Sequence, residues 1–437
     1  MTSNTRVVVI GAGLAGVRLA RRLGELGTPV TLVGDEEHRP YNRVLLAEVL
    51  AGRYSPEVIA LPAPAELTRG RVTGIDREAR AVHLADGSEI AYDTLVLATG
   101  SNPVLPPLRG LFTDMYLASA HRPTDPTGLS GRGSGGRPPG RHSTPDHVLP
   151  EGVHAFRTMD DCLGLSKAVR PGVRAVVIGG GLLGVSAARA LAMRGAQVVL
   201  AQQSERLMER QLDPAASKLV RRHLGDLGVE VHTDLRVRDV RCVGGAVRSV
   251  EMADGYALDA DIVVLACGVR PRAGLAQAAG LEVRKGIVVD DELRTSDPHI
   301  RAVGDCAQHD GTVYGLAAPA LEQADVLAEL LAADAGDAGA RYTGTRALTR
   351  LTLAGEGFFD LAVFGETEAL PGDDVVQLTD ATRGTYRKVV VRDDRLVGGV
   401  LVGELGTVGA LARAWEGAEP LPDDGPLLHL LTNDGGS

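Results

Sequence analysis

Two glycine triplets of identical spacing are the residues of this sequence that point most directly to a chemical task. They are Gly11-x-Gly13-x-x-Gly16 and Gly179-x-Gly181-x-x-Gly184. In such a triplet the first glycine permits a tight turn, the second lets the backbone approach a pyrophosphate, and the third lets a helix pack closely on a strand. The N-terminus of that helix offers free N–H groups and a favourable dipole to the phosphates. Each triplet therefore predicts a dinucleotide-binding turn, which also includes the first residues of each helix, Leu14, Ala15, Leu182 and Leu183.

In each glycine-turn unit, the residue after the second strand is expected to contact the ribose of the bound dinucleotide. An acid at this place accepts hydrogen bonds from the ribose diol. In the first unit Asp35 stands at this place, 24 positions after Gly11, and Glu36 follows it. We expect these two acids to contribute to binding of the first dinucleotide.

The matching position of the second unit holds Gln202. A carboxylate there would bind the 2′-OH of NAD and repel the 2′-phosphate of NADP, whereas glutamine does the first weakly and the second not at all. Arg206 and Arg210 lie just beyond and could meet a 2′-phosphate, although Glu205 opposes this. The choice between the two coenzymes stays open.

The elements that must position these residues follow from an internal repeat. Residues 7–36 and 175–205 each contain a buried apolar strand, a glycine turn, a helix rich in Ala and Leu, and a second strand. This unit implies a parallel sheet with helices on its faces. The chain is therefore predicted to be an α/β protein with two doubly wound Rossmann-like domains.

Three further segments should complete these domains. LVLATGSNP at 95–103 and VVLACGVRP at 263–271 each predict a buried strand that ends in a turn of small residues. Residues 295–307 predict a strand from Ile300 to Val303 ending in Gly304-Asp305, with a helix from about Ala318 to Leu331 after it. The turns add Ala98, Thr99 and Gly100 to the first site, and Gly268 to the second.

We predict that residues 1–120 and 271–338 form the first dinucleotide domain and that residues 151–270 form the second. Residues 121–150 are dominated by Pro, Gly, Ser, Arg and His, which predicts a loop insertion. This segment carries four Arg and two Asp, so it could dock an acidic redox partner or be unstructured filler. Short β-like runs, an RDDR hairpin signal and the amphipathic stretch 405–417 predict a smaller α+β domain over 339–437.

Composition excludes several classes of protein. The net charge of −10 argues against a nucleic acid or an anionic membrane as partner. No apolar run approaches 18 residues, and the N-terminus lacks the pattern of a signal peptide. We therefore expect a cytoplasmic protein of 437 residues.

The four cysteines, Cys162, Cys242, Cys267 and Cys306, are at least 25 positions apart. No local redox disulfide can form from this spacing, and no cysteine-rich metal or iron–sulfur motif is present. We expect buried thiols and no metal site. A redox role stays open only for Cys306, which follows the Gly304-Asp305 turn.

The paired triplets, the two small-residue turns and TSDPHIRAVGD resemble the pyridine nucleotide-disulfide oxidoreductase superfamily over about residues 5–335. The resemblance implies FAD at the first site and NADH or NADPH at the second. It also implies that Asp305 bonds the FAD ribitol, that the backbone of Val72 contacts the adenine, and that the helix after Ala318 points toward the flavin.

A closer resemblance is carried by RPYNRVLLAEVLAG at 39–52, RLMERQLD at 206–213, YGLAAPALEQADVLA at 314–328 and TYRKVVVRDDRLVGGVLVG at 385–403. These segments look like the FAD/NAD part of assimilatory nitrite reductase large subunits and of nitrate-assimilation electron-transfer subunits. The likeness implies that Arg43 lies on the FAD pyrophosphate.

The sequence departs from these relatives in three ways. The family's redox cysteines are missing, so disulfide-reductase chemistry is not expected. The Lys–Glu pair that rubredoxin-reductase-like relatives carry beside the flavin is replaced by Glu48 and Ser186. Cysteine ligands for the iron–sulfur and sirohaem groups of nitrite reductase are absent, so we expect no nitrite reduction by that route.

The resulting hypothesis is an FAD-dependent NAD(P)H oxidoreductase that passes electrons to a separate protein acceptor. That acceptor would be a ferredoxin-like protein or a nitrate or nitrite reductase component, and the chain could form a homodimer. No side chain is expected to act as acid, base or nucleophile, because the cofactor carries the chemistry. Two alternatives remain: an NAD(P)H oxidase that uses oxygen directly, and a redox-sensing flavoprotein that acts through assembly.

Overall fold

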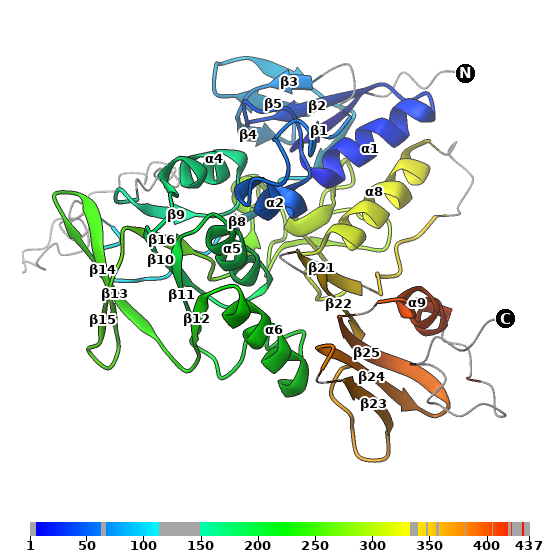
Figure 1. Ribbon diagram of the computed structural model, residues 1–437. Coiled ribbons are helices and arrows are strands. Elements are labelled where there is room, and N and C mark those ends of the chain that lie inside the picture. Colours follow the sequence, from blue (N-terminus) through cyan, green and yellow to red (C-terminus); the bar gives the residue numbers. More distant parts are fainter. Residues whose placement is uncertain are drawn as a thin grey trace, which may run out of the picture.

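The structure, a computed structural model, describes residues 6–62, 67–112, 149–332, 340–346, 348–354, 358–380, 382–403, 405–417, 421 and 431. The predicted insertion at 121–150 lies outside the described residues except for Leu149 and Pro150. The described chain contains two parallel sheets and a C-terminal antiparallel sheet, which Figure 1 shows at the top, the left and the bottom.

The first parallel sheet contains four strands from the first 100 residues and one strand from near residue 300. Its strands, in spatial order, are β19 (Ile300–Ala302), β7 (Thr94–Leu97), β1 (Val7–Ile10), β2 (Val30–Gly34) and β3 (Leu67–Arg69). Ile300 pairs with Leu95, which confirms the predicted strand near residue 300. β1 is buried along its whole length, as expected for a sheet covered on both faces.

Helices and a small antiparallel sheet cover this first sheet. The helix α1 (Leu14–Glu25) forms because apolar residues recur at helical spacing and are buried, as Leu19 and Leu23 are. It lies beside α8 (Ala317–Ala332) in Figure 1, and Arg18 Nε bonds Asp325 Oδ1 at 2.6 Å between them. The antiparallel strands β4 (Val72–Asp76), β5 (Ala81–Leu84) and β6 (Glu89–Ala91) pack into the same core.

The second parallel sheet repeats this plan. Its strands, in spatial order, are β12 (Val229–His232), β11 (Gln197–Ala201), β10 (Arg174–Ile178), β16 (Ile262–Leu265) and β9 (Val153–Ala155). Its helices are α4 (Met159–Ala168), α5 (Leu182–Met193) and α6 (Pro214–Asp226). The antiparallel strands β13 (Val237–Val243), β14 (Ala246–Met252) and β15 (Ala257–Asp259) extend from it. Together the two sheets confirm the predicted α/β fold.

Short elements connect the two parallel sheets. The chain leaves the first sheet through β8 (Ser101–Pro103) and returns through β17 (Val269–Pro271), and these two strands pair antiparallel. After β2 it forms the 3-10 turn η1 (Arg43–Leu45) and the helix α2 (Leu46–Leu50). The return path contains α7 (Gly274–Ala278), β18 (Ile287–Val289), η2 (Gly304–Cys306) and β20 (Ala307–His309).

The C-terminal sheet is antiparallel, in the order β21 (Leu348–Ala354), β22 (Phe358–Gly365), β25 (Arg395–Gly403), β24 (Thr385–Arg392) and β23 (Asp374–Asp380). The helix α9 (Val408–Gly417) packs on it. The predicted RDDR hairpin is confirmed, because Asp393 and Asp394 join β24 to β25 with φ of 49° and 57°. Positive φ at both central residues is typical of a two-residue hairpin turn.

A buried polar contact fastens the C-terminal sheet to the second parallel sheet. Asp213 caps α6 by accepting a hydrogen bond from the Ala216 N–H at 2.9 Å. Its other oxygen accepts from the Tyr386 hydroxyl at 2.6 Å and from Lys388 Nζ at 3.2 Å. The His223 ring also stacks on Phe359 at 4.3 Å, so the C-terminal sheet is tied to α6 at several points.

Candidate dinucleotide-binding cavity

A cavity of about 1810 Å³ lies where the carboxyl ends of the two parallel sheets meet. Both glycine turns contribute to its wall, as open α/β sheets bind ligands outside the carboxyl ends of their strands. The predicted site residues that line it are Gly13, Leu14, Ala15, Arg43, Ala98, Gly100, Gly304 and Asp305 from the first site, and Gly179, Gly181, Leu182, Leu183, Gln202 and Gly268 from the second. The predicted residues outside its lining are Gly11, Gly16, Asp35, Glu36, Val72, Thr99 and Gly184.

The first triplet has the geometry of a pyrophosphate cradle. Gly11 has a φ of +113°, and a Cβ there would lie 2.1 Å from the Ala98 carbonyl oxygen. A Cβ on Gly16 would lie 1.9 Å from the Gly11 carbonyl oxygen, so this glycine lets α1 approach the turn. At Gly13 a Cβ would meet nothing within 4 Å, so the backbone there faces open space. The first and third glycines therefore shape the turn, and the second leaves room for a ligand.

The second triplet repeats each of these features. Gly179 has a φ of +108°, and a Cβ there would lie 2.4 Å from the Ala266 carbonyl oxygen. A Cβ on Gly184 would lie 1.8 Å from the Gly179 carbonyl oxygen, whereas one on Gly181 would meet nothing within 4 Å. Neither α1 nor α5 carries an acid in its first turn, so both N-termini present uncompensated N–H groups. The two turns therefore fit two dinucleotides.

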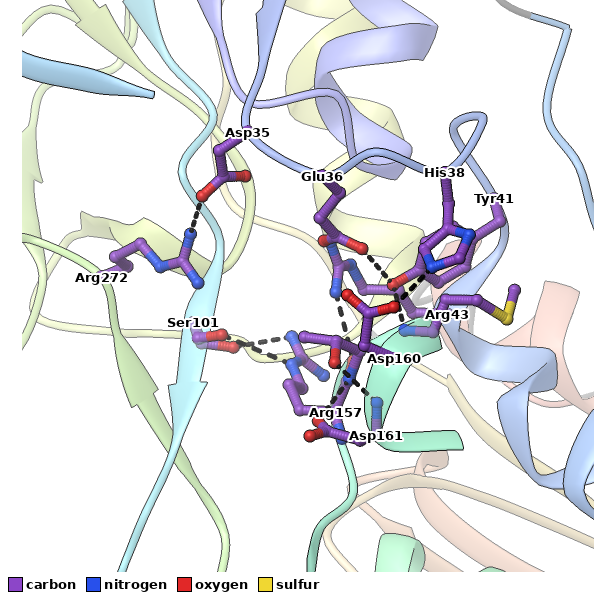
Figure 2. A network of polar contacts seen from close by, with 12 residues as sticks. Asp35, Glu36, His38, Tyr41, Arg43, Ser101, Arg157, Asp160, Asp161 and Arg272 are labelled. Atoms are coloured by element: carbon purple, nitrogen blue, oxygen red, sulfur yellow. Dashed lines mark hydrogen bonds and ion pairs between the residues drawn. The ribbon is translucent and has the colours of Figure 1, made fainter. Parts of the chain in front are cut away.

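The neighbouring acids at the end of β2 point in different directions, as Figure 2 shows. Asp35 lies 3.3 Å from Arg272 Nη1, on the segment that returns from the second sheet. Glu36 pairs with Arg43 and accepts a hydrogen bond from the Tyr41 hydroxyl at 2.7 Å. Burial raises the pKa of Tyr41, so its hydroxyl stays a donor. Glu36 therefore holds Arg43 at the cavity wall, whereas Asp35 pairs with Arg272 outside the cavity lining.

Arg157 is a cavity residue that sequence reasoning missed. Its Nη2 donates to Asp305 Oδ2 and to Ser101 Oγ, each at 2.7 Å, and the Ser101 hydroxyl donates to the same carboxylate oxygen at 2.8 Å. The backbone carbonyl of Arg157 accepts from Arg43 Nη1 at 3.1 Å. Figure 2 shows Arg157 between Ser101 and the start of α4. The second parallel sheet thereby contributes a side chain to the predicted FAD site.

A local signal for Arg157 exists in the sequence. Thr158 caps α4, and Asp161 completes a capping box by accepting from the Thr158 N–H at 2.8 Å. The same carboxylate accepts from the Arg157 N–H at 2.9 Å. A Thr-x-x-Asp box therefore locates the helix start, and Arg157 is the residue just before it.

The segment around η2 places the N-terminus of α8 at the cavity. Gly304 has a φ of +78°, and its N–H donates to Oε1 of the buried Gln323 at 2.7 Å. Ala317 and Ala318, at the start of α8, line the cavity. The positive end of the helix dipole therefore faces the space beside Asp305, which favours negative charge there.

One of the two positions of the missing Lys–Glu pair, Glu48, forms an ion pair with a different residue. Glu48 on α2 pairs with Arg189 on α5, whose side chain is fully buried, and lies 3.2 Å from Arg53 Nη1. Ser186 lines the cavity one turn before Arg189, and its hydroxyl donates to the Leu182 carbonyl at 2.8 Å. The acid of this ion pair, Glu48, thus comes from α2 and the cation, Arg189, from α5, and neither residue lines the cavity.

The cysteines do not form a redox pair in this structure. All four are free, and Cys267 lines the cavity. Burial raises the pKa of the Cys267 thiol to about 11, and burial also raises the pKa of Cys306, which contacts the Leu97 carbonyl at 3.3 Å. Both thiols therefore stay protonated near neutral pH and are poor nucleophiles. Within the described ranges no group of three His, Cys, Asp or Glu residues could hold a metal ion.

The charges around the cavity differ from those of the whole chain. Its described lining holds two carboxylates, Glu209 and Asp305, although the chain has a net charge of −10. The lining cations are Arg43, Arg109, Arg157, Arg210, Arg236, Arg238, Arg270, Lys285 and Arg350. An anionic ligand such as a dinucleotide fits this lining.

None of the helices in the described parts of the chain has the length and hydrophobicity needed to cross a bilayer.

Comparison with known proteins agrees with this geometry. Residues 5–324 match the family described as Pyridine nucleotide-disulphide oxidoreductase, and residues 352–416 match the domain described as Rubredoxin NAD+ reductase C-terminal domain. The fold is similar to that in the crystal structure of the covalent putidaredoxin reductase–putidaredoxin complex, with a TM-score of 0.78 and 25% identity over 98% of each chain.

Two curated relatives are longer than this chain. The assimilatory nitrate reductase electron transfer subunit of Bacillus subtilis (strain 168) is 32% identical over 412 residues, which are 91% of this chain and 48% of that protein. The NAD(P)H nitrite reductase large subunit of Klebsiella oxytoca is 34% identical over 414 residues, which are 92% of this chain and 38% of that protein. The chain thus spans about half or less of the length of these relatives.

Proposed function

This chain belongs to the pyridine nucleotide-disulphide oxidoreductase family, and we propose that it passes electrons from NAD(P)H through FAD to a separate redox protein. It is an oxidoreductase that binds FAD and NAD(P)H. The observation that carries the proposal is that both dinucleotide turns line one cavity, in which Cys267 is the only cysteine among the described lining residues. Two dinucleotides can therefore meet there without a disulfide between them.

We place FAD along the first sheet. Gly11 and Gly16 would shape the turn, and Gly13, Leu14 and Ala15 would offer backbone N–H groups to the pyrophosphate beside Arg43. Asp35 would take the ribose, with Glu36 holding Arg43 in place. Ala98, Thr99 and Gly100 would border the flavin, and Gly304 and Asp305 the ribitol. Val72, on β4, would contact the adenine from outside the cavity.

We place the nicotinamide coenzyme along the second sheet. Gly179 and Gly184 would shape this turn, and Gly181, Leu182 and Leu183 would hold the pyrophosphate. Gln202 would face the adenosine ribose, and Gly268, between β16 and β17, would border the nicotinamide half. These assignments, like the domain limits at residues 120, 150, 270 and 338, stay predictions.

When bound along the first sheet, FAD would supply the two-electron redox chemistry between the nicotinamide coenzyme and the acceptor. The residues of this chain bind and orient the two dinucleotides and exclude water between them. The N-terminus of α8 favours negative charge beside the flavin position. Asp305 is already bonded by Arg157 and Ser101, so we assign it to binding and not to proton transfer.

A protein is the proposed acceptor, namely a ferredoxin-like protein or a component of a nitrate or nitrite reductase. The names of the relatives support this assignment, since one is an electron transfer subunit and one solved neighbour is a complex with putidaredoxin. A homodimer and a cytoplasmic location stay predictions, which sedimentation of the holoprotein and cell fractionation can test.

Anaerobic stopped-flow mixing of the FAD-loaded protein with NADH or NADPH tests the proposal. We expect the oxidised flavin absorbance to bleach within milliseconds to seconds and to return when an oxidised ferredoxin is added. A flavin that stays oxidised with both coenzymes would contradict the proposed function. Rapid reoxidation by air, with none by any candidate acceptor protein, would favour the oxidase alternative. Slow bleaching with a change of oligomeric state would favour the redox-sensing alternative.

A further inference from the structure

We propose that the coenzyme of this chain is NADPH and not NADH. The inference rests on the proposed function, because it takes the turn at Gly179–Gly184 as the nicotinamide-coenzyme site. NADPH differs from NADH by a phosphate on the adenosine 2′ position, which adds about −1.5 to −2 charges. The residues beyond the end of β11 decide between the two, because they surround that ribose.

The side chain at the end of β11 does not repel a phosphate. β11 ends at Ala201, and Gln202 follows it at the cavity wall. The Gln202 Oε1 atom accepts a hydrogen bond from the Gly180 N–H at 2.7 Å, so the side-chain oxygen is turned into the glycine loop. The Nε2 atom makes only a long contact of 3.4 Å, to the Arg206 carbonyl. The position thus offers an amide donor where an NADH site would offer a carboxylate.

One carboxylate at this end, Glu209, lines the cavity, and Glu205 and Glu368 lie outside its described lining. Glu209 accepts a hydrogen bond from the Ser204 hydroxyl at 2.7 Å. Glu368, in the connection between β22 and β23, lies 3.2 Å from Arg206 Nη2. Glu205, which opposed a phosphate in the sequence, is exposed and does not line the cavity. Because Arg206 has a carboxylate partner, we leave it out of the proposed phosphate site.

Two other arginines at this rim have no counter-charge. Arg236 follows Leu235, whose N–H donates to the Gln202 carbonyl at 3.0 Å, so Arg236 lies beside the end of β11. Arg210 lines the same cavity from the segment before α6. Both residues are exposed, and neither forms an ion pair with a described residue, in contrast to Arg206. Two guanidinium groups that form no ion pair with a described residue, beside an amide donor, match the charge and the hydrogen-bond acceptors of a phosphate.

The test compares wild type with Arg210→Ala, Arg236→Ala, the double variant, Gln202→Glu and the control Arg248→Ala. Arg248 is an exposed arginine on β14, next to β13, and does not line the cavity. The measurements are kcat/KM for flavin reduction by each coenzyme, and the Kd of adenosine 2′,5′-bisphosphate against AMP. The ratio of these two Kd values measures how much the 2′-phosphate contributes to binding, and it needs no turnover.

We expect wild type to favour NADPH over NADH by about tenfold or more, since a charge-assisted hydrogen bond contributes about that factor. Arg236→Ala and Arg210→Ala should each weaken NADPH and the 2′,5′-bisphosphate by about tenfold and leave NADH and AMP unchanged. Gln202→Glu should move the preference toward NADH, and Arg248→Ala should change nothing.

Preference for NADH in the wild type, or equal loss of both coenzymes in the arginine variants, would overturn the inference. A flavin that neither coenzyme reduces would overturn the proposed function instead. In that case tighter binding of the 2′,5′-bisphosphate than of AMP still supports the phosphate site, and equal binding rejects it.

Discussion

The Arg157 guanidinium donates a hydrogen bond to the Asp305 carboxylate at 2.7 Å, across 148 residues of sequence. Arg157 precedes α4 of the second parallel sheet, whereas Asp305 follows β19 of the first. The carboxylate predicted to bind the FAD ribitol is therefore oriented by the domain predicted to bind the coenzyme. The geometry of the predicted FAD site thus depends on how the two sheets pack.

Replacing Arg157 should weaken FAD binding. Arg157→Gln removes the charged partner of Asp305, and loss of a charge-assisted hydrogen bond costs about 1.5–3 kcal/mol. The Kd of FAD for the apoprotein should rise by about ten- to a hundredfold, measured by flavin fluorescence quenching. Arg157→Lys keeps the charge but loses the planar fork, so its effect should be intermediate. An unchanged Kd in Arg157→Gln would mean that FAD binding does not depend on the contact between Arg157 and Asp305.

Gly13 and Gly16 should respond differently to alanine. A Cβ on Gly16 would lie 1.9 Å from the Gly11 carbonyl oxygen, so Gly16→Ala should destabilise the apoprotein by roughly 1–3 kcal/mol. Gly13 has a φ of −84° and open space around its Cβ position, so Gly13→Ala should fold normally.

The same two variants separate folding from binding. Gly13→Ala should bind FAD weakly, because its methyl group would occupy the space predicted for the pyrophosphate. Urea unfolding of the apoprotein and an FAD titration measure the two effects independently. Normal FAD affinity in Gly13→Ala would mean that the pyrophosphate does not approach this turn.

The cavity thiol should be unreactive at neutral pH. Burial raises the pKa of Cys267 to about 11, and only the thiolate is alkylated. The rate of Cys267 labelling by iodoacetamide should therefore be low at pH 7 and rise about tenfold per pH unit toward pH 11, followed by mass spectrometry. Cys267→Ala should keep the rate of flavin reduction within about twofold, since the thiol takes no part in electron transfer. Fast labelling at pH 7 would show an activated thiolate.

Separating the charges of Glu48 and Arg189 should destabilise the protein. Glu48→Gln removes a carboxylate partner from a guanidinium that is fully buried, and breaking such a pair costs about 3–5 kcal/mol. The double variant Glu48→Gln/Arg189→Met should recover part of this loss, because no buried charge remains. Urea unfolding of the wild type, Glu48→Gln, Arg189→Met and the double variant gives the coupling energy. Additive losses would show that the two side chains do not depend on each other.

Several features were predictable from sequence because they depend on contacts between near neighbours in the chain. The backbone geometry of Gly11 and Gly179 follows from a strand–turn–helix unit that is complete within about 30 residues. The hairpin at Asp393 and Asp394 follows from two residues and their flanking strands. The start of α8 was predicted within one residue, because apolar periodicity marks a helix.

The tertiary structure alone decided which side chains face each other. Glu36 and Asp35 are adjacent in sequence, yet Glu36 pairs with Arg43 and Asp35 pairs with Arg272. Arg272 follows β17, after the chain has passed through the second sheet. Arg157, the partner of Asp305, and Arg189, the buried partner of Glu48, are likewise more than 100 residues away. Local propensity carries no information about such contacts, because they form only when the two sheets pack. The sequence therefore determined the two dinucleotide turns, and packing of the two sheets joined them into one cavity and selected its charged residues.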